Sequence, residues 1–307
     1  MAAKKSNSTS AVNKTKILKI VLSFVSAVLA ILCAELIASK LSNIFRIGEG
    51  LVSSTTFILF IIRSVISAAA FILLGGKQWL SFKKDPIKNS FKYTTPVVII
   101  NLILSILLFT LFLSVQFIPE DQLNGVTLEI VPGYGGRIAA VIPLMILVGI
   151  NEELIFRGLT VGGMLLWFGK KKNGILIAAI ISSIIFGYIH VMSDIDFSNT
   201  SSLMTGLMKT LETAMFGLIF CCAILKHENL WGVIIAHAVF DGLLFAPMQL
   251  TDGGFNVSYV STDPQQAKLQ CIFFGILVLL YLPLTIKSIK ALSAMQPTEG
   301  PFADNKE

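Results

Sequence analysis

The chain has 307 residues, of which 54% are hydrophobic and only 14% are charged, and its net charge is +6. Soluble domains have about 45–50% apolar and about 25% charged residues, so too few charges are present here to cover a water-exposed surface. With a mean hydropathy of +0.80, this composition predicts an integral membrane protein. It excludes a soluble enzyme, a nucleic-acid-binding protein and a disordered chain.

Long apolar segments recur along the chain. A helix of about 20 mostly apolar residues crosses about 30 Å of hydrocarbon. By this length the sequence predicts about eight membrane-spanning helices, at residues 17–38, 53–74, 97–117, 138–168, 175–192, 203–225, 230–246 and 269–287. No internal repeat or linker divides them, so we predict an all-α, polytopic helical bundle over residues 17–287. Residues 1–16 and 288–307 are expected to be short disordered tails.

The segments between these helices alternate in charge. Every second segment, beginning with the N-terminal tail, is rich in lysine, for example Lys83 and Lys84 after the second helix and Lys170 to Lys172 after the fourth. The other segments hold most of the acidic loop residues. Because lysine and arginine concentrate on the cytoplasmic side of membrane proteins, we predict a multi-pass protein of the cell membrane with both termini in the cytoplasm.

The fourth predicted helix contains three charges, in the sequence Glu152-Glu153-Leu154-Ile155-Phe156-Arg157. Each charge costs about 2.5–3.5 kcal/mol at the centre of a membrane, so unpaired charges are rare there. Glu153 and Arg157 are four residues apart with the acid first, the favourable order for an ion pair on a helix. Glu152 is rotated by about 100° from Glu153. One glutamate is therefore expected to be structural and the other free, although a polar contact between helices without any chemistry would also explain the pattern.

Two of the three histidines lie within predicted helices. His190 follows Phe186 by four residues at the end of the fifth helix. His237 and Asp241 are also four residues apart, which places both side chains on one face of the seventh helix. Each of these could be a buried, hydrogen-bonded group, but their combination with a free carboxylate favours a catalytic site.

Two other pairs of charges within the helices have a structural explanation. Lys209 and Glu212 are three residues apart on the sixth helix and can neutralise one another. Glu35 and Arg63 lie on neighbouring helices and can do the same. We predict structural ion pairs in both cases.

Three motifs in this order resemble those of the CPBP intramembrane proteases: Glu152-Glu153-x-x-x-Arg157, Phe186-x-x-x-His190 and His237-x-x-x-Asp241. This family includes the CAAX prenyl endopeptidases and the bacteriocin-processing or bacteriocin-immunity proteins of the Abi family. The resemblance covers residues 138–246, about a third of the chain. It implies a bundle of about eight helices with a catalytic cavity inside the membrane.

The resemblance also implies a role for each motif residue. Glu152 would be the general base, and His190 would help it to hold the attacking water. Glu153, Arg157 and Phe186 would support this geometry. His237 and the residue at position 241 would stabilise the oxyanion. The family most often has Asn at that last position, whereas this chain has Asp241, which either is protonated in its buried site or orients His237 instead.

The same resemblance leaves the question of a metal open. Glu152, His190 and His237 form a set of ligands that zinc accepts, and the family has been described both as metal-dependent and as metal-independent. The chain has neither the G-x-S-x-G motif of serine hydrolases nor the H-E-x-x-H motif of zinc peptidases. We predict a water activated by glutamate without a cofactor, with zinc as the second option.

These observations favour a CAAX-protease-like intramembrane endopeptidase whose substrate is a membrane-associated peptide or protein. One alternative is a non-catalytic membrane protein of the same fold that acts in bacteriocin self-immunity or as a scaffold. Such a protein would be expected to have lost motif residues. The other alternative is a transporter, in which buried acids and histidines relay protons. That function predicts inverted repeats or helices broken by Gly and Pro in matching halves, which this sequence does not show.

Overall fold

A computed structural model describes residues 2–41, 53–115, 130, 132–250 and 258–303. In these residues the chain forms helices joined by turns and short connections, and no β-strand. The helices are α1 (Ala2–Leu41), α2 (Ser54–Leu73), α3 (Lys84–Val115), α4 (Tyr134–Glu152), α5 (Val161–Phe168), α6 (Gly174–Ile189), α7 (Thr200–His227), α8 (Trp231–Met248) and α9 (Pro264–Ser293). Three shorter elements are the 3-10 helices η2 (Gly76–Leu80) and η5 (Gly300–Phe302) and the π-helix η4 (Glu153–Thr160).

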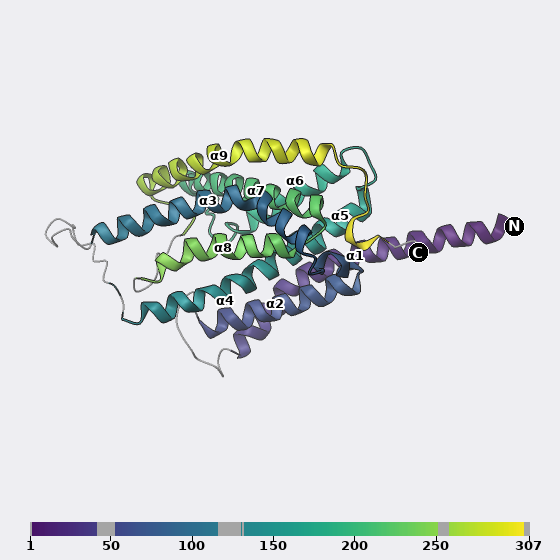
Figure 1. The fold of residues 1–307 in the computed structure, drawn as a ribbon, viewed down its shortest axis with the longest axis horizontal. Helices are drawn as coiled ribbons and strands as arrows, with labels where there is room; N and C mark the ends of the chain where they lie inside the picture. The colour runs from purple at the N-terminus through teal and green to yellow at the C-terminus, as the bar shows by residue number, and fades with distance from the viewer. Residues whose placement is uncertain (1, 42–52, 116–129, 131, 251–257, 304–307) are drawn as a thin grey trace.

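The long helices lie side by side and form one elongated bundle (Figure 1). Seven helical segments of the described residues are long and apolar enough to cross a membrane, and α4, η4 and α5 together make one of them. The predicted class, an all-helical polytopic bundle, is therefore confirmed.

The predicted number of eight full-length spans needs a correction at α6. This helix is apolar but has only 16 residues, which at 1.5 Å per residue gives a length of about 24 Å. It ends at Ile189, because His190 is the cap residue and the chain turns at once, whereas the apolar pattern continues to Met192. The short helix ends inside the bundle and leaves its terminal histidine beside the other helices.

Helices are present in both segments that the sequence analysis assigns to tails. Helix α1 begins at Ala2, so the helix continues outward through the predicted disordered tail. At the other end, α9 continues to Ser293, and the chain then returns to the bundle as far as η5. Phe302 is fully buried there, and Lys19 of α1 donates a hydrogen bond to its carbonyl at 3.0 Å. Helical structure is thus present on both sides of residues 17–287.

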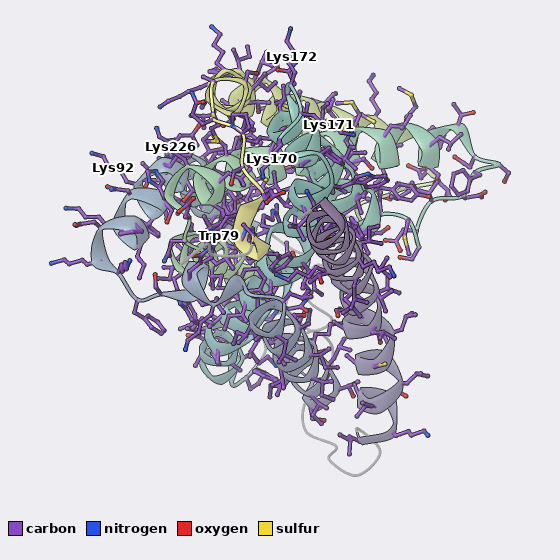
Figure 2. The ribbon with its side chains drawn as sticks, turned by 90° about the vertical axis from the view of Figure 1, so that its right-hand side faces the viewer. Trp79, Lys92, Lys170, Lys171, Lys172 and Lys226 are labelled. Carbon is purple, nitrogen blue, oxygen red and sulfur yellow. The ribbon has the colours of Figure 1, made fainter. Side chains whose placement is uncertain are left out.

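Both chain termini lie at the same end of the bundle (Figure 1). The view of this end shows Lys92, Lys226 and the three lysines from Lys170 to Lys172 (Figure 2). Lys92 lies on α3, Lys226 lies in the last turn of α7, and the other three lysines follow α5. The alternating charge of the sequence therefore corresponds to one basic end of the folded bundle.

Candidate active site

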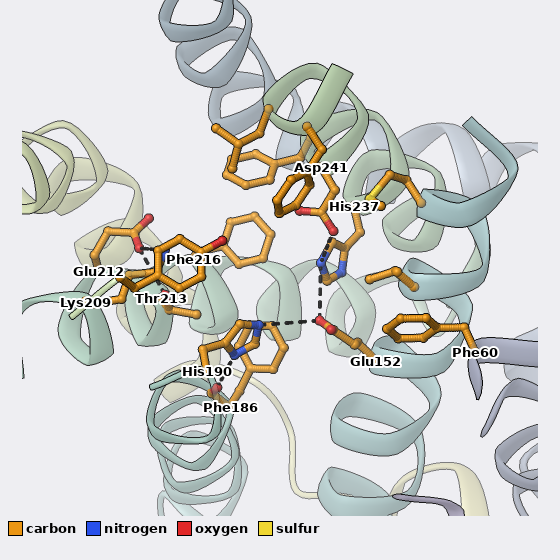
Figure 3. Close-up of a pocket in the computed structure, with 16 residues that line it drawn as sticks. Phe60, Glu152, Phe186, His190, Lys209, Glu212, Thr213, Phe216, His237 and Asp241 are labelled. Carbon is orange, nitrogen blue, oxygen red and sulfur yellow. Dashed lines mark hydrogen bonds and ion pairs between the residues drawn. The ribbon is translucent and has the colours of Figure 1, made fainter. Parts of the chain in front are cut away.

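The candidate catalytic side chains come from three helices and line one cavity of about 200 Å³ (Figure 3). Glu152 is the last residue of α4, and His190 caps the C-terminal end of α6. His237 and Asp241 lie one turn apart on α8. The structure therefore brings together four residues that are up to 89 positions apart in the sequence.

Glu152 occupies the centre of this group (Figure 3). Its Oε2 atom lies 3.8 Å from Nε2 of His190 and 3.5 Å from Nε2 of His237. Among the described residues this oxygen has no hydrogen-bond partner. Both distances exceed the usual hydrogen-bond length of about 2.7–3.2 Å. The carboxylate is thus close to both imidazoles without being committed to either of them.

The backbone of α6 fixes the orientation of His190. Its Nδ1 atom lies 2.6 Å from the carbonyl oxygen of Phe186, one turn earlier on the same helix. A carbonyl can only accept a hydrogen bond, so Nδ1 carries a proton and donates it. In the neutral ring, Nε2 is then an acceptor that faces Glu152.

Glu153 connects two of the motifs. Its Oε1 atom lies 3.2 Å from Nη1 of Arg157 and accepts a hydrogen bond from Nδ1 of His237 at 2.7 Å. The side chains of Glu153 and Arg157 are almost completely buried. The predicted ion pair is therefore confirmed. The contact with His237 was not expected, because nothing in the local sequence shows that α8 approaches this part of the chain.

The residues after Glu152 form a π-helix instead of continuing the α-helix. A π-turn contains one additional residue and leaves carbonyl groups with altered partners, and such turns occur often at functional sites. Two hydroxyl groups bind these carbonyls: Thr160 donates to Ile155 at 2.8 Å, and Ser182 of α6 donates to Phe156 at 3.0 Å. The apolar pattern of the sequence gives no sign of this change of helix type.

Phe186 packs against Arg157 of the buried ion pair and against the two imidazoles. The guanidinium carbon of Arg157 lies 4.0 Å from the centre of the Phe186 ring, a cation–π contact. On the other side, the ring centre is 4.5 Å from that of His190 and 6.3 Å from that of His237. Phe186 therefore packs against all three charged or titratable groups and holds their relative positions.

Gly149 is a functional position that the sequence analysis missed. It lies one turn before Glu152 and Glu153, where α4 crosses α8. A Cβ atom at this glycine would lie only 2.9 Å from the carbonyl oxygen of Ile234 and 3.5 Å from Cβ of His237. The absence of a side chain lets the two helices approach until Glu153 reaches His237.

Asp241 lies beside the other nitrogen of His237. Its Oδ2 atom is 3.4 Å from Nε2, and the side chain is 14% exposed, whereas that of His237 is 3% exposed. The orientation of the imidazole is already held at Nδ1 by Glu153. Asp241 therefore faces the cavity on the same side as Glu152.

Glu152, His190 and His237 are the residues of this site that could hold a metal ion. Within the described part of the chain, no group of three His, Cys, Asp or Glu side chains is placed to hold an ion. Nδ1 of His237 is used by Glu153, and its Nε2 faces two carboxylates at 3.4 and 3.5 Å. Ligands at about 2.0–2.2 Å from a tetrahedral zinc ion lie about 3.3–3.6 Å from one another, and Oε2 of Glu152 is 3.8 and 3.5 Å from the two imidazole nitrogens.

The structure thus places a carboxylate and two imidazoles around an interior cavity of a polytopic helical bundle. Residues 135–243, about a third of the chain, match the family model of the type II CAAX prenyl endopeptidase Rce1-like proteins. This segment contains all three motifs, so the predicted resemblance to the CPBP/CAAX intramembrane peptidases is confirmed. A comparison with curated proteins finds no match.

Proposed function

We propose that this protein is an intramembrane endopeptidase that hydrolyses a membrane-associated peptide or protein with a water activated by Glu152. One observation carries the proposal most directly. In a cavity inside the bundle, a carboxylate oxygen faces the acceptor nitrogen of His190 at 3.8 Å. A water molecule could donate one hydrogen bond to each of these two atoms.

In the proposed reaction, Glu152 carries one proton from the water to the leaving amine. Glu152 takes a proton from the water while the water oxygen bonds to the carbonyl carbon of the substrate amide. When the C–N bond breaks, the protonated Glu152 gives this proton to the leaving amine. The products are a carboxylic acid and an amine, and the carboxylate of Glu152 is restored.

His237 and Asp241 are proposed to stabilise the oxyanion that forms when water attacks. With Nδ1 of His237 bound to Glu153, a proton on Nε2 would point into the cavity as a donor. A protonated Asp241, 3.4 Å from that nitrogen, would supply a second donor, as Asn would at the same position. Of the two roles that the sequence left open for Asp241, this one fits better, because Glu153 already orients His237. Donors fixed in a water-poor site stabilise the developing charge strongly.

The bundle is proposed to lie in the cell membrane with its basic end in the cytoplasm. The lysines of this end support that orientation. On a cysteine-free background, cysteines at positions 84 and 171 should react with a membrane-impermeant probe only from the inside, and one at position 196 only from the outside. The reverse pattern would contradict the orientation without affecting the fold.

Replacing Glu152 tests the catalytic proposal. Glu152→Gln keeps the size of the side chain but removes the base, so peptide cleavage should fall by at least about 100-fold while the melting temperature stays within about 2 °C. The matched control is Glu35→Gln, because Glu35 is another carboxylate within the membrane, pairs with Arg63 and lines no part of the cavity. Full cleavage by a well-folded Glu152→Gln protein would refute the mechanism, and an immunity or scaffold function would then take its place.

A further inference from the structure

The proposed mechanism leaves one buried ion pair of the cavity unused. Lys209 and Glu212 of α7 line the same cavity as Glu152, and they lie on its opposite side (Figure 3). Nζ of Lys209 lies 2.9 Å from Oε2 of Glu212, which also accepts a hydrogen bond from Thr213 at 3.0 Å. The predicted pair therefore exists, and it also forms part of the cavity wall.

An ion pair at this place contributes little to stability by itself. Removing two charges from water costs about as much as their attraction returns, and apolar residues of similar size often serve equally well. Ionisable groups inside a membrane protein commonly mark a path or a site for a ligand. Because the pair lies in a cavity wall, a function in binding a ligand explains it better than a contribution to stability does.

Lys209 has donors that its partner does not use. An ammonium group carries three N–H donors, and Glu212 accepts one of them. On other sides the ammonium faces aromatic rings, with the ring centre of Tyr259 at 4.5 Å and that of Phe274 at 5.3 Å. The side chain is 14% exposed, so a ligand in the cavity can reach it.

The charges of the cavity restrict what this ligand can be. Glu152, Asp241 and Glu212 contribute three carboxyl groups to the lining. Among the described residues, Lys209 is the only lysine or arginine that lines it. Beside Lys209 a carboxylate on a substrate would meet a lysine ammonium group, which no other part of the described lining offers.

A second, apolar cavity of about 330 Å³ begins at the same pair. Five residues line both cavities, and they are listed here together: Lys209, Glu212, Phe240, Leu244 and Tyr259. The lining of the second cavity includes the hydroxyl of Tyr281 and the amide oxygen of Gln270, two buried atoms without a hydrogen-bond partner among the described residues. A ligand held at Lys209 therefore has an adjoining apolar space that contains two unused polar groups.

We infer that Lys209 is a specificity-determining residue that binds a carboxylate of the substrate, while an adjacent apolar side chain of the substrate enters the second cavity. This inference rests on the proposed peptidase function. The carboxylate could be the C-terminal group of the peptide or the side chain of an Asp or Glu near the cleaved bond. Because Lys209 and Glu152 share one small cavity, the bound carboxylate lies close in sequence to the bond that is hydrolysed.

Four peptide pools distinguish the two sources of the carboxylate. All are N-terminally acylated peptides of randomised apolar residues. The first pool has a free C-terminal acid, the second has a C-terminal amide, the third is an amide with one internal glutamate, and the fourth is the same amide with glutamine. Cleavage is measured by mass spectrometry with the full-length protein in phosphatidylcholine nanodiscs. We expect kcat/KM to be about 10- to 100-fold higher for the pool with the recognised carboxylate than for its neutral counterpart.

Substitutions then assign this preference to Lys209. Lys209→Gln should lower cleavage of the carboxylate pool to the level of its neutral counterpart, with little effect on the neutral pool, and Lys209→Arg should retain the preference. The matched control is Lys226→Gln, since Lys226 lies on the same helix beside Tyr93 and lines neither cavity. If Lys209→Gln does not fold, Lys209→Met combined with Glu212→Met removes both charges and leaves neither unpaired.

Binding to the Glu152→Gln protein separates this inference from the proposed function. Its melting temperature should rise with the carboxylate pool, and the rise should vanish when Lys209→Gln is added. If the wild type cleaves no pool but this binding is seen, the peptidase proposal fails and the binding site remains. Equal cleavage and equal binding of acid, amide, glutamate and glutamine pools would overturn the inference, and so would a preference that survives Lys209→Gln.

Discussion

Glu153 has two partners in the structure, and they correspond to two separate functions. It neutralises Arg157, which is otherwise a buried cation, and it holds Nδ1 of His237 at 2.7 Å. The imidazole can then present only Nε2 to the cavity. A residue that the spacing identifies as structural is therefore also the residue that positions a proposed oxyanion donor.

Substitutions of the buried pair should separate these two functions. Glu153→Gln leaves Arg157 without a counter-charge, so it should destabilise the protein by about 3–5 kcal/mol. The double variant Glu153→Leu with Arg157→Met removes both charges and should restore most of the melting temperature. Cleavage should remain at least about 10-fold reduced, because His237 has lost its acceptor. Recovery of both stability and cleavage in the double variant would show that Glu153 acts only through Arg157.

Removal of metal ions tests the chemistry of the same residues. We predict that Glu152, His190 and His237 activate water without a bound zinc ion. Cleavage by the purified protein should therefore survive prolonged dialysis against a strong chelator with less than about a two-fold change. Zinc present in a one-to-one ratio by elemental analysis, and lost and regained together with activity, would contradict this prediction and make His237 a ligand.

Sequence spacing predicts contacts within one helix much better than contacts between helices. The Glu153–Arg157 and Lys209–Glu212 pairs follow from helical periodicity and are present. The link from Glu153 to His237 depends on how α4 packs against α8, which no local pattern records. For the same reason Lys209 could be identified as paired but not as part of a cavity wall.

At the scale of helices, the close crossing of α4 and α8 depends on Gly149. Apolar length predicted where the helices lie, since hydrocarbon thickness determines how many apolar residues a span needs. Neither the π-helix after Glu152 nor the early end of α6 changes apolar length in a way that a hydropathy pattern detects. Both features place site residues, so the part of the fold that the sequence missed is the part that builds the cavity.

A methyl group at Gly149 should separate the two helices. The Cβ atom of Gly149→Ala would lie 2.9 Å from a backbone oxygen of α8, which cannot move independently of its helix. We expect a loss of about 1–3 kcal/mol in stability and a loss of cleavage that exceeds the fraction unfolded. The matched control is Gly136→Ala on the same helix, where no atom lies within 4 Å of the added methyl group. This variant should be neutral or slightly stabilising, and equal damage from both variants would contradict the proposed crossing contact.

At the scale of the whole molecule, the C-terminal segment joins elements from both ends of the sequence. Glu299 lies 2.6 Å from Nζ of Lys16 on α1 and 3.2 Å from Nζ of Lys170 after α5. Phe302 packs edge-on against Phe71 of α2, with 5.4 Å between ring centres. This segment therefore ties together the helices that precede the site and the span that contains Glu152.

The ionic part of this connection should depend on pH in a defined direction. The pKa of Glu299 is lowered, mainly because Lys16 donates a hydrogen bond to its carboxylate. A lowered pKa in the folded state means that the contribution to stability is complete above the ordinary glutamate pKa of about 4.3 and disappears as the pH falls through the folded-state value. Glu299→Gln should thus lower the melting temperature slightly at pH 7, by an amount equivalent to at most about 1 kcal/mol. The difference from the wild type should decline below the ordinary glutamate pKa of about 4.3 and vanish once the pH lies below the lowered pKa of Glu299. Phe302→Ala, the control within the same segment, removes apolar packing and should lower the melting temperature by a similar amount at every pH. A Glu299→Gln effect that persists unchanged to pH 3 would show that the segment is held by packing alone.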